Sequence, residues 1–436
     1  MKYSFRRAFI WLFFYFFLAL IPLAIAITGD VPRFRSFWIE MGVALGFIGL
    51  AMFALQFLFS GRFTSIAPHF GMDNILQFHK YIGIVAFFFV LAHPITLIIA
   101  DPEFLKYFDP RVNFLRAIAL SFATLALVFI TITSIWRVTF KLNYEKWRLV
   151  HGFLALSLVF IGVVHSLQVG HYLDELWKKI ALATVMGGSM YLAIHTRIVR
   201  PWLNKNKPYK IVDVQEERDE CWTISLEPMG HERMKFIAGQ FAWITINDSP
   251  FSLQQHPFSF ASGEKDKYLK FTAKEMGDFT SSWSSLEEGT RAFLEGPFGS
   301  FTLVPGKNLF LVMGGIGVTP AMSMLRTLKQ NKDNRKVILI YGSEDWENIT
   351  FREELEELGK ILNMDLVHIL MEPNDDWEGE VGKVDQDFLE KYLPENKHDF
   401  IYFICGPGPL MDITEISLRN LGVDWRLTYS ERFEIV

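Results

Sequence analysis

Long hydrophobic stretches dominate the first half of the chain and are absent from the second half. Each stretch approaches or exceeds the ~20 residues that a helix needs to cross ~30 Å of hydrocarbon. Turn residues and charges separate them. They cover roughly residues 8–27, 38–59, 76–100, 113–135, 149–169 and 179–199. The pattern predicts a six-helix transmembrane bundle within residues 1–206.

Short strand-like runs replace the long stretches from about residue 207. Residues 222–226, 241–246 and 269–273 predict an antiparallel β-barrel over 207–305. After Pro305-Gly306, apolar runs are mostly separated by helical stretches, which is typical of a parallel α/β sheet. These runs are 309–313, 336–341, 365–370 and 400–404. Residues 306–436 are therefore predicted to form an α/β nucleotide domain.

Composition agrees with a protein that lies partly in a membrane. Half of the 436 residues are hydrophobic, 42 are Phe, and the mean hydropathy is +0.21. The net charge of −5 gives no reason to expect nucleic acid. Cys221 and Cys405 are far apart and form no CxxC motif, so neither a structural zinc nor a redox dithiol is predicted.

The basic residues between the stretches predict the orientation of the bundle. The first stretch is long enough to span, and no small-residue cleavage site follows it, so it is not expected to be a signal peptide. With the N-terminus inside, the inner segments carry about twice as many Lys and Arg residues as the outer ones. Both termini and the soluble half are therefore expected in the cytoplasm, with the bundle in the plasma membrane. Lipids are expected partners, and no obligatory protein partner is evident.

Two predicted spans each contain a pair of histidines. His79 and His93 are 14 residues apart in the third span, and so are His151 and His165 in the fifth. Fourteen residues are nearly four helical turns, so each pair lies on one helix face, roughly 21 Å apart. Histidine is costly in hydrocarbon, and imidazoles on both sides of an iron are a common haem ligation. Because both spans run outward, His79 and His151 are expected to hold an inner haem, and His93 and His165 an outer one.

Two alternatives compete with this interpretation. The histidines could be interfacial or packing residues, or they could bind a different metal. Zinc or copper takes three or four close ligands, whereas the two histidines of one span lie too far apart for that. His195, His69 and His171 have no matching partners and are not assigned to a site.

Glycine-rich segments in the soluble half predict nucleotide binding. Gly314-Gly315-Ile316-Gly317-Val318-Thr319-Pro320 follows a strand and opens an amphipathic helix, as a dinucleotide phosphate loop does. Cys405-Gly406-Pro407-Gly408 follows another apolar strand, and two such turns suggest one shared crevice. His256-Pro257-Phe258-Ser259, Lys274, Gly277-Asp278-Phe279-Thr280 and Gly296-Pro297-Phe298-Gly299 precede them, and a glycine-led turn suits a pyrophosphate.

These motifs together resemble the ferric reductase and NADPH oxidase family in its compact bacterial form, over nearly the whole chain. The front half resembles the ferric-reductase transmembrane domain, and the back half resembles a ferredoxin-NADP reductase module. The resemblance implies FAD, two b-type haems and NAD(P)H as cofactors.

The resemblance also implies roles for single residues. The flavin ring and ribityl chain would contact His256, Pro257, Phe258 and Ser259. The FAD pyrophosphate would lie near Lys274, Gly277, Asp278, Phe279 and Thr280. The nicotinamide nucleotide would be held by Gly314, Gly315, Gly317, Val318, Thr319 and Pro320, with Cys405, Gly406 and Pro407 near the nicotinamide. Phe433 would stack on the flavin, although a tail anchor in the core is the alternative, and Cys405 and Phe433 would be the catalytic pair.

One position departs from the family pattern. Members that prefer NADPH often place an Arg after the second strand of this domain, where this chain has Glu344 and Asp345. Two carboxylates repel a 2′-phosphate and can accept a hydrogen bond from a ribose hydroxyl. Arg352 could compensate, so NADH is expected to serve at least as well as NADPH.

The predicted function is transmembrane electron transfer. Hydride carries two electrons and haem accepts one at a time, so a flavin is needed between them. The expected acceptor is oxygen outside the cell, giving superoxide, with a ferric chelate as the alternative. A haem-free membrane protein with a fused flavin reductase is a further alternative, in which the histidines are incidental.

Overall fold

The computed structural model describes residues 5–61 and 72–432. The chain forms two compact units, one helical and extending to Arg200, the other beginning at Pro201 and built around two β-sheets.

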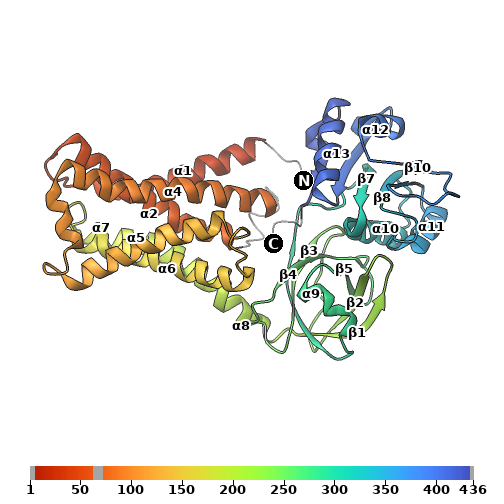
Figure 1. Ribbon diagram of the computed structural model, residues 1–436, viewed down its shortest axis with the longest axis horizontal. Helices are drawn as coiled ribbons and strands as arrows, with labels where there is room; N and C mark the ends of the chain where they lie inside the picture. The colour runs from red at the N-terminus through yellow and green to blue at the C-terminus, as the bar shows by residue number, and fades with distance from the viewer. Residues whose placement is uncertain (1–4, 62–71, 433–436) are drawn as a thin grey trace. The chain divides into compact units, whose positions relative to one another are not determined.

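The helical unit consists mainly of long apolar helices (Figure 1). These are α1 (Phe5–Ile27), α2 (Phe37–Ser60), α4 (Met72–Ala100), α5 (Phe114–Ile135), α6 (Tyr144–Val169) and α7 (Leu176–Ile194). A 3₁₀ helix, Pro102–Phe108, follows α4, and α7 continues through a π-helical turn, His195–Val199, into α8 (Arg200–Asn204). Side chains of Ser36, Asn113 and Asn143 cap α2, α5 and α6 by accepting hydrogen bonds from backbone N–H groups.

Five of the described helices are long and apolar enough to cross a membrane, whereas the sequence predicted six spans. They are α1, α2, α4, α5 and α6. The sixth predicted span is a helix, α7, but Lys178 and Lys179 lie in its first turn and lower its hydropathy. Lys178 is nevertheless buried, because its ammonium pairs with the Glu175 carboxylate at 2.9 Å and donates to the Asp30 carbonyl at 2.8 Å. The sixth span and the cytoplasmic orientation stay predictions.

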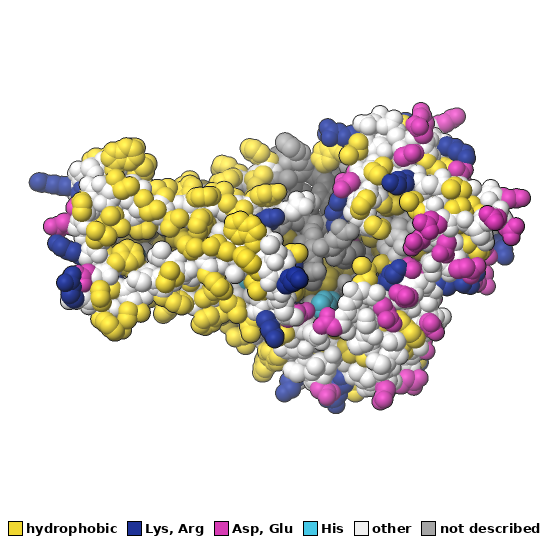
Figure 2. Space-filling model, viewed as in Figure 1, with side chains coloured by type: hydrophobic (Ala, Val, Ile, Leu, Met, Phe, Trp, Pro, Cys, Tyr) yellow, Lys and Arg dark blue, Asp and Glu magenta, His cyan; other side chains and the backbone are white. Residues whose placement is uncertain are grey.

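Large apolar side chains on the outside of the helical unit are freely exposed. Ile99, Leu115 and Leu125 are 71–79% exposed, and Figure 2 shows a largely hydrophobic face over these helices. An extended apolar surface of this kind is unfavourable in water and favourable in hydrocarbon. The helical unit therefore has the surface of a membrane domain.

Glycines on α2 set its close approach to α4. A Cβ atom at Gly42, Gly46 or Gly49 would lie 2.7–3.0 Å from a side chain of α4, on Leu97, His93 and Val90 respectively. Small residues at such spacings let two membrane helices pack backbone to backbone. Successive glycines along α2 meet progressively earlier residues of α4, so the two helices are antiparallel.

The first sheet of the other unit is antiparallel. Its strands are β1 (Tyr209–Glu216), β2 (Cys221–Pro228), β3 (Phe241–Ile246), β4 (His256–Ser259), β5 (Leu269–Lys274) and β6 (Arg291–Phe298), in the order β4-β3-β6-β1-β2-β5. A bridge between Phe260 and Phe271 joins the β4 end to β5, so the sheet is a half-barrel around a core that includes Trp283. The predicted antiparallel β-barrel is therefore present as a half-barrel sheet.

The second sheet is parallel. Its strands are β7 (Asn308–Gly314), β8 (Val337–Ser343), β9 (Met364–Leu370), β10 (Glu380–Val381), β11 (Phe400–Cys405) and β12 (Thr428–Ser430), in the order β10-β9-β8-β7-β11-β12. Alternate residues of β7 face opposite layers: Leu311 packs with helices α10 (Thr319–Asn331) and α11 (Arg352–Ile361), and Val312 with α12 (Gln386–Tyr392) and α13 (Gly408–Asn420). Helices thus cover both faces, which explains why its strands are apolar on both sides.

Candidate functional site

The four histidines of the spans lie in two pairs, each made by one residue of α4 and one of α6. The ring centres of His79 and His151 are 6.2 Å apart, and those of His93 and His165 are 6.4 Å apart. A metal–imidazole bond is about 2 Å long, and the bonding nitrogen lies about 1 Å from the ring centre, so two axial imidazoles have centres about 6 to 6.5 Å apart. Both pairs therefore have the separation required of two ligands on opposite sides of one ion.

An aromatic ring and an arginine accompany each pair. The Trp147 ring lies 4.9 Å from the His151 ring, and the Arg137 guanidinium lies over Trp147 at 5.8 Å. At the other pair, Tyr107 meets the His165 ring edge-on at 5.8 Å. Arg116 stacks on Tyr107 at 4.3 Å. Each pair thus has an adjacent positive charge, which suits an anionic substituent of a planar cofactor.

The described residues offer no suitable set of ligands for zinc or copper. Among residues 5–61 and 72–432, no group of three or more His, Cys, Asp and Glu side chains could hold a metal ion. The zinc or copper alternative requires such a group. Two pairs of two imidazoles instead fit a cofactor that supplies the equatorial ligands itself, as a haem does.

The predicted flavin segment is the edge strand β4 of the half-barrel. Its Phe258 ring packs against Trp283 at 4.9 Å, and the His256 ring packs against Phe279 at 4.5 Å. Gly277 and Asp278 are exposed, and the Thr280 hydroxyl accepts from the Met276 backbone N–H at 2.9 Å. These predicted residues therefore lie together where β4 approaches β5 and the turn that follows it.

Lys274 is already engaged in an ion pair. Its ammonium lies 2.5 Å from the Asp219 carboxylate, and this hydrogen bond holds the pKa of Lys274 above its ordinary value although burial opposes the rise. A phosphate near Lys274 would have to share this charge with Asp219, a residue that the motif did not indicate.

The two glycine turns of the nucleotide domain are in direct contact. They follow β7 and β11, which are neighbours in the sheet, with Met313 opposite Cys405. The chain proceeds from β7 toward β8 and β9 on one side, and then crosses to β11 on the other. This is the topological switch point at which open α/β sheets bind nucleotides. The prediction that both turns share one crevice agrees with this placement.

Gly317 is required by the contact between the turns. A Cβ atom there would lie 2.5 Å from the Cys405 carbonyl oxygen and 2.8 Å from the Gly406 Cα. Gly315 has a φ of +50° and its carbonyl accepts from the Tyr341 hydroxyl at 3.1 Å. By contrast, the side chains of Val318, Thr319 and Pro320 are buried, so only their backbone can serve a ligand.

The C-terminal segment brings a buried carboxylate to the same place. The Cys405 thiol donates to the Glu431 carbonyl at 3.6 Å, and Glu431 is 5% exposed. A Cβ atom at Gly299 would lie 3.0 Å from Glu431 Oε1, so the half-barrel also reaches this point. The sequence motifs did not single out Glu431, because nothing local shows that it is buried. Phe433 lies outside the described residues.

The turn after β8 separates the roles of Glu344, Asp345 and Arg352. Glu344 is exposed, whereas the Asp345 carboxylate accepts from the Asn348 backbone and side-chain N–H groups, both at 2.8 Å. Arg352 donates to the Trp346 carbonyl at 2.8 Å and lies 4.8 Å from the Trp346 ring centre. Asp345 and Arg352 therefore build the turn, and Glu344 is the residue available to a ligand.

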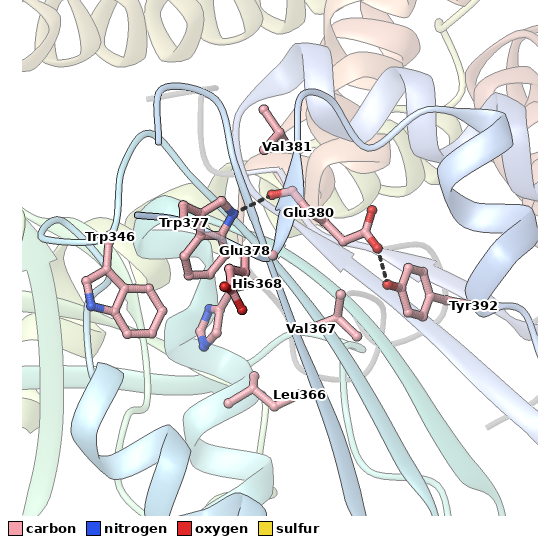
Figure 3. Close-up of a pocket in the computed structure, with 10 residues that line it drawn as sticks. Trp346, Leu366, Val367, His368, Trp377, Glu378, Glu380, Val381 and Tyr392 are labelled. Carbon is pink, nitrogen blue, oxygen red and sulfur yellow. Dashed lines mark hydrogen bonds between the residues drawn. The ribbon is translucent and has the colours of Figure 1, made fainter. Parts of the chain in front are cut away.

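A groove of about 540 Å³ runs along the outer edge of β9 (Figure 3). It is open because β10 pairs only with Ile369 and Leu370. Trp346 and Trp377 lie in its wall with ring centres 5.1 Å apart, and the Glu380 carboxylate accepts from the Tyr392 hydroxyl at 2.6 Å. The groove adjoins the Glu344 turn through Trp346 and contains none of the glycine-turn residues.

Three protein families match consecutive parts of this chain. Residues 45–162 match the family described as ferric reductase like transmembrane component. Residues 207–302 match an FAD-binding domain, and 311–415 an oxidoreductase NAD-binding domain. The predicted succession of a membrane domain, an FAD-binding domain and an NAD-binding domain is confirmed.

Curated relatives match only part of the chain. A flavohemoprotein of Bacillus subtilis is 30% identical over 228 residues, 50% of this chain and 56% of that protein. NADH-cytochrome b5 reductase 2 of Candida albicans is 34% identical over 155 residues, 34% of this chain and 51% of that protein. The chain thus spans about half the length of these relatives.

One solved structure resembles the chain over most of its length. It is flavohemoglobin from Malassezia yamatoensis with bound FAD and heme, with a TM-score of 0.50 and 19% identity, covering 91% of this chain and 96% of that one. At this identity the likeness concerns the fold alone.

Proposed function

Because the chain has the ferric reductase/NADPH oxidase-like architecture, we propose that it carries electrons from cytoplasmic NAD(P)H, through FAD and two haems, to an acceptor outside the cell. The proposal assigns residues 1–206 to the membrane haem domain, 207–305 to FAD and 306–436 to the nucleotide. It includes α7 as the sixth span.

The observation that carries the proposal is the near equality of the two histidine separations, 6.2 and 6.4 Å. Independent packing histidines have no reason to meet twice across the same two helices at one distance. Bound there, two haems would supply one-electron carriers on the path across the membrane. Arg137 and Arg116 would balance the haem carboxylates.

The soluble residues would bring hydride and flavin together. His256 to Ser259 and the Gly277 to Thr280 turn would bind FAD, and the paired glycine turns would hold the nicotinamide nucleotide. Cys405 would lie next to the nicotinamide, with Glu431 fixing the thiol through its backbone carbonyl. Two observations favour NADH as the donor: Glu344 is exposed, and one relative is named NADH-cytochrome b5 reductase 2.

Oxygen is the proposed acceptor, reduced to superoxide. An iron with two histidine ligands has no open position for oxygen, so the electron must pass without oxygen binding to the metal. A ferric chelate could accept an electron in the same way, without binding to the haem iron, and is the second candidate acceptor.

The test is anaerobic reduction of the purified protein with NADH, followed by oxygen or a ferric chelate. We expect a reduced-minus-oxidised haem spectrum, fast haem reoxidation by oxygen, and about two superoxide molecules for each NADH consumed, because hydride carries two electrons and superoxide takes one. Fast reoxidation only by the chelate would replace oxygen with ferric iron as acceptor. Absence of a haem spectrum would overturn the proposal in favour of a haem-free flavin reductase.

A further inference from the structure

We propose that α2 and α5, which supply no ligand, each fix one histidine of one haem site by a hydrogen bond to its Nδ1 atom. Gly42 of α2 holds His93, and Ser134 of α5 holds His151. These are positioning residues, and the inference rests on the proposed function because it concerns the ligands of the two haems.

The His93 ring is fixed by backbone. Its Nδ1 lies 2.8 Å from the Gly42 carbonyl oxygen. A carbonyl can only accept, so Nδ1 carries the proton and Nε2 keeps its lone pair for a metal. Gly46 makes this possible, because a Cβ atom there would lie 2.7 Å from the same Nδ1. The glycine-lined face of α2 therefore positions the His93 ring and also packs closely against α4.

The His151 ring is fixed by a side chain. Its Nδ1 lies 3.2 Å from the Ser134 hydroxyl oxygen, and that hydroxyl donates its one proton to the Ile130 carbonyl. The serine oxygen must therefore accept from Nδ1–H. This assigns the same tautomer to His151 as to His93, with Nε2 available to iron.

Among the described residues, the second histidine of each pair has no such hydrogen bond at Nδ1. His79 Nδ1 and His165 Nδ1 are buried, and neither has a hydrogen-bond partner within residues 5–61 and 72–432. Each site thus combines one anchored imidazole and one without an anchor. An acceptor at Nδ1 fixes the ring and makes the imidazole a stronger donor, which favours oxidised iron. Loss of one anchor should therefore raise the midpoint potential of one haem and leave the other unchanged.

The serine provides the sharper test. Ser134→Ala removes the acceptor, Ser134→Thr restores a hydroxyl, and Ser157→Ala is the matched control. The Ser157 hydroxyl donates to the Phe153 carbonyl at 2.9 Å, a bond within its own helix. Spectroelectrochemical titration of the purified holoprotein resolves the two haems, and EPR reports the geometry of each.

We expect Ser134→Ala to raise one midpoint potential by about 59 mV, which corresponds to a tenfold change in relative affinity for the two iron states. The Thr variant should restore the wild-type value, and Ser157→Ala should leave both potentials unchanged. Two unmoved potentials in Ser134→Ala, or a Thr variant that behaves like Ala, would overturn the inference. Wild-type protein without haem would instead overturn the proposed function.

Gly46→Ala tests the other anchor. The added methyl must displace the His93 ring, so the EPR signal and potential of the second haem should change while those of the Ser134-dependent haem stay. Gly188→Ala is its control, since a Cβ atom there meets nothing within 4 Å. A change in the Ser134-dependent haem, or no change in either haem, would contradict the assignment.

Discussion

The histidine pairs of the helical unit and the glycine turns of the nucleotide sheet bring distant residues together in different ways. In the helical unit, equal spacing on α4 and α6 places two pairs at nearly the same separation. In the sheet, β7 and β11 become neighbours only because the chain crosses from one side of the sheet to the other. The first arrangement depends on helix periodicity, and the second on topology and close backbone contact.

This difference decides what a single substitution should do. A proposed haem ligand in the helical unit is one side chain on a regular scaffold, so its loss should remove one haem and spare the fold. A glycine in the turns is part of the scaffold itself, so its replacement should disturb both turns. Residues at the rim of either site should matter less.

The largest effect is expected at the histidines. His93→Ala or His165→Ala should lower haem content from two to one per chain and leave hydride transfer to flavin intact, because the proposed ligand pair is lost while the β-sheet unit is unchanged. Haem per protein from a pyridine haemochrome assay measures this. His195→Ala, whose ring packs against Tyr191, is the control. Two haems per chain in either ligand variant would refute the assignment.

Gly317→Ala should have the next largest effect. Its Cβ must displace the Cys405 backbone, which lies 2.5 Å away, and misplacement of about 1 Å can cost roughly a hundredfold in rate. We expect that loss in kcat/KM for NADH with full haem content. Gly359→Ala, in α11 with only an ordinary contact of 3.6 Å, should keep full activity. Equal activities in the two variants would show that the turns do not form the nucleotide site.

Glu344→Arg should change nucleotide choice by about tenfold. A 2′-phosphate near this carboxylate is repelled by about 1 kcal/mol in an exposed site, and an arginine would attract it instead. The preference should move toward NADPH, mainly through KM, in steady-state assays with both nucleotides. Glu356→Arg, an exposed change elsewhere in the domain, is the control. A wild type that favours NADPH a hundredfold would contradict the role given to Glu344.

Phe433→Ser should tighten nicotinamide binding severalfold, if the ring covers the flavin face that the nicotinamide needs. Stacked aromatic pairs contribute about 0.5–1.5 kcal/mol, which limits the gain. Titration of the oxidised protein with a nicotinamide nucleotide measures it, and Trp425→Ser, at an exposed residue, is the control. Unchanged affinity would make Phe433 a tail anchor only.

The smallest effect is expected at Arg218, which joins the half-barrel to α11. Its guanidinium lies 2.6 Å from the Glu353 carboxylate, and this hydrogen bond lowers the pKa of Glu353 from 4.5 to about 2. Since the folded pKa is depressed, the stabilisation is complete above pH 4.5 and disappears as the pH falls toward 2. Glu353 is 64% exposed, so Arg218→Ala should cost less than about 1 kcal/mol.

Thermal release of flavin fluorescence can measure this difference. The wild type and Arg218→Ala should differ at pH 7 and converge at the lowest pH at which both remain folded. Lys332→Ala, at an exposed helix end, is the control. A gap between wild type and Arg218→Ala that widens on acidification would contradict the assigned ion pair.

Several features followed from the sequence because they depend on local regularity. The histidine spacing, the apolar length of five spans and the strand–glycine–helix order of residues 309–328 each lie within one element or one turn. Helical periodicity and backbone hydrogen bonding then leave few alternatives for their local structure. The sequence did not decide how far the barrel closes or how Lys178 is buried in the sixth predicted span, because both depend on distant partners.

The candidate chemistry could be assigned to particular residues without a structure: four histidines at one repeated spacing and two glycine turns after apolar strands. The partners that those residues meet are known only from the folded structure. It tied Arg352 and Asp345 into a turn and left Glu344 exposed, and it buried Glu431 beside Cys405. It also placed Ser134 against His151 and Gly42 against His93. The physical reason is the range of the interactions along the chain. Helix and strand periodicity depend on a few neighbouring residues, whereas these contacts join elements that only the packing of the whole unit brings together.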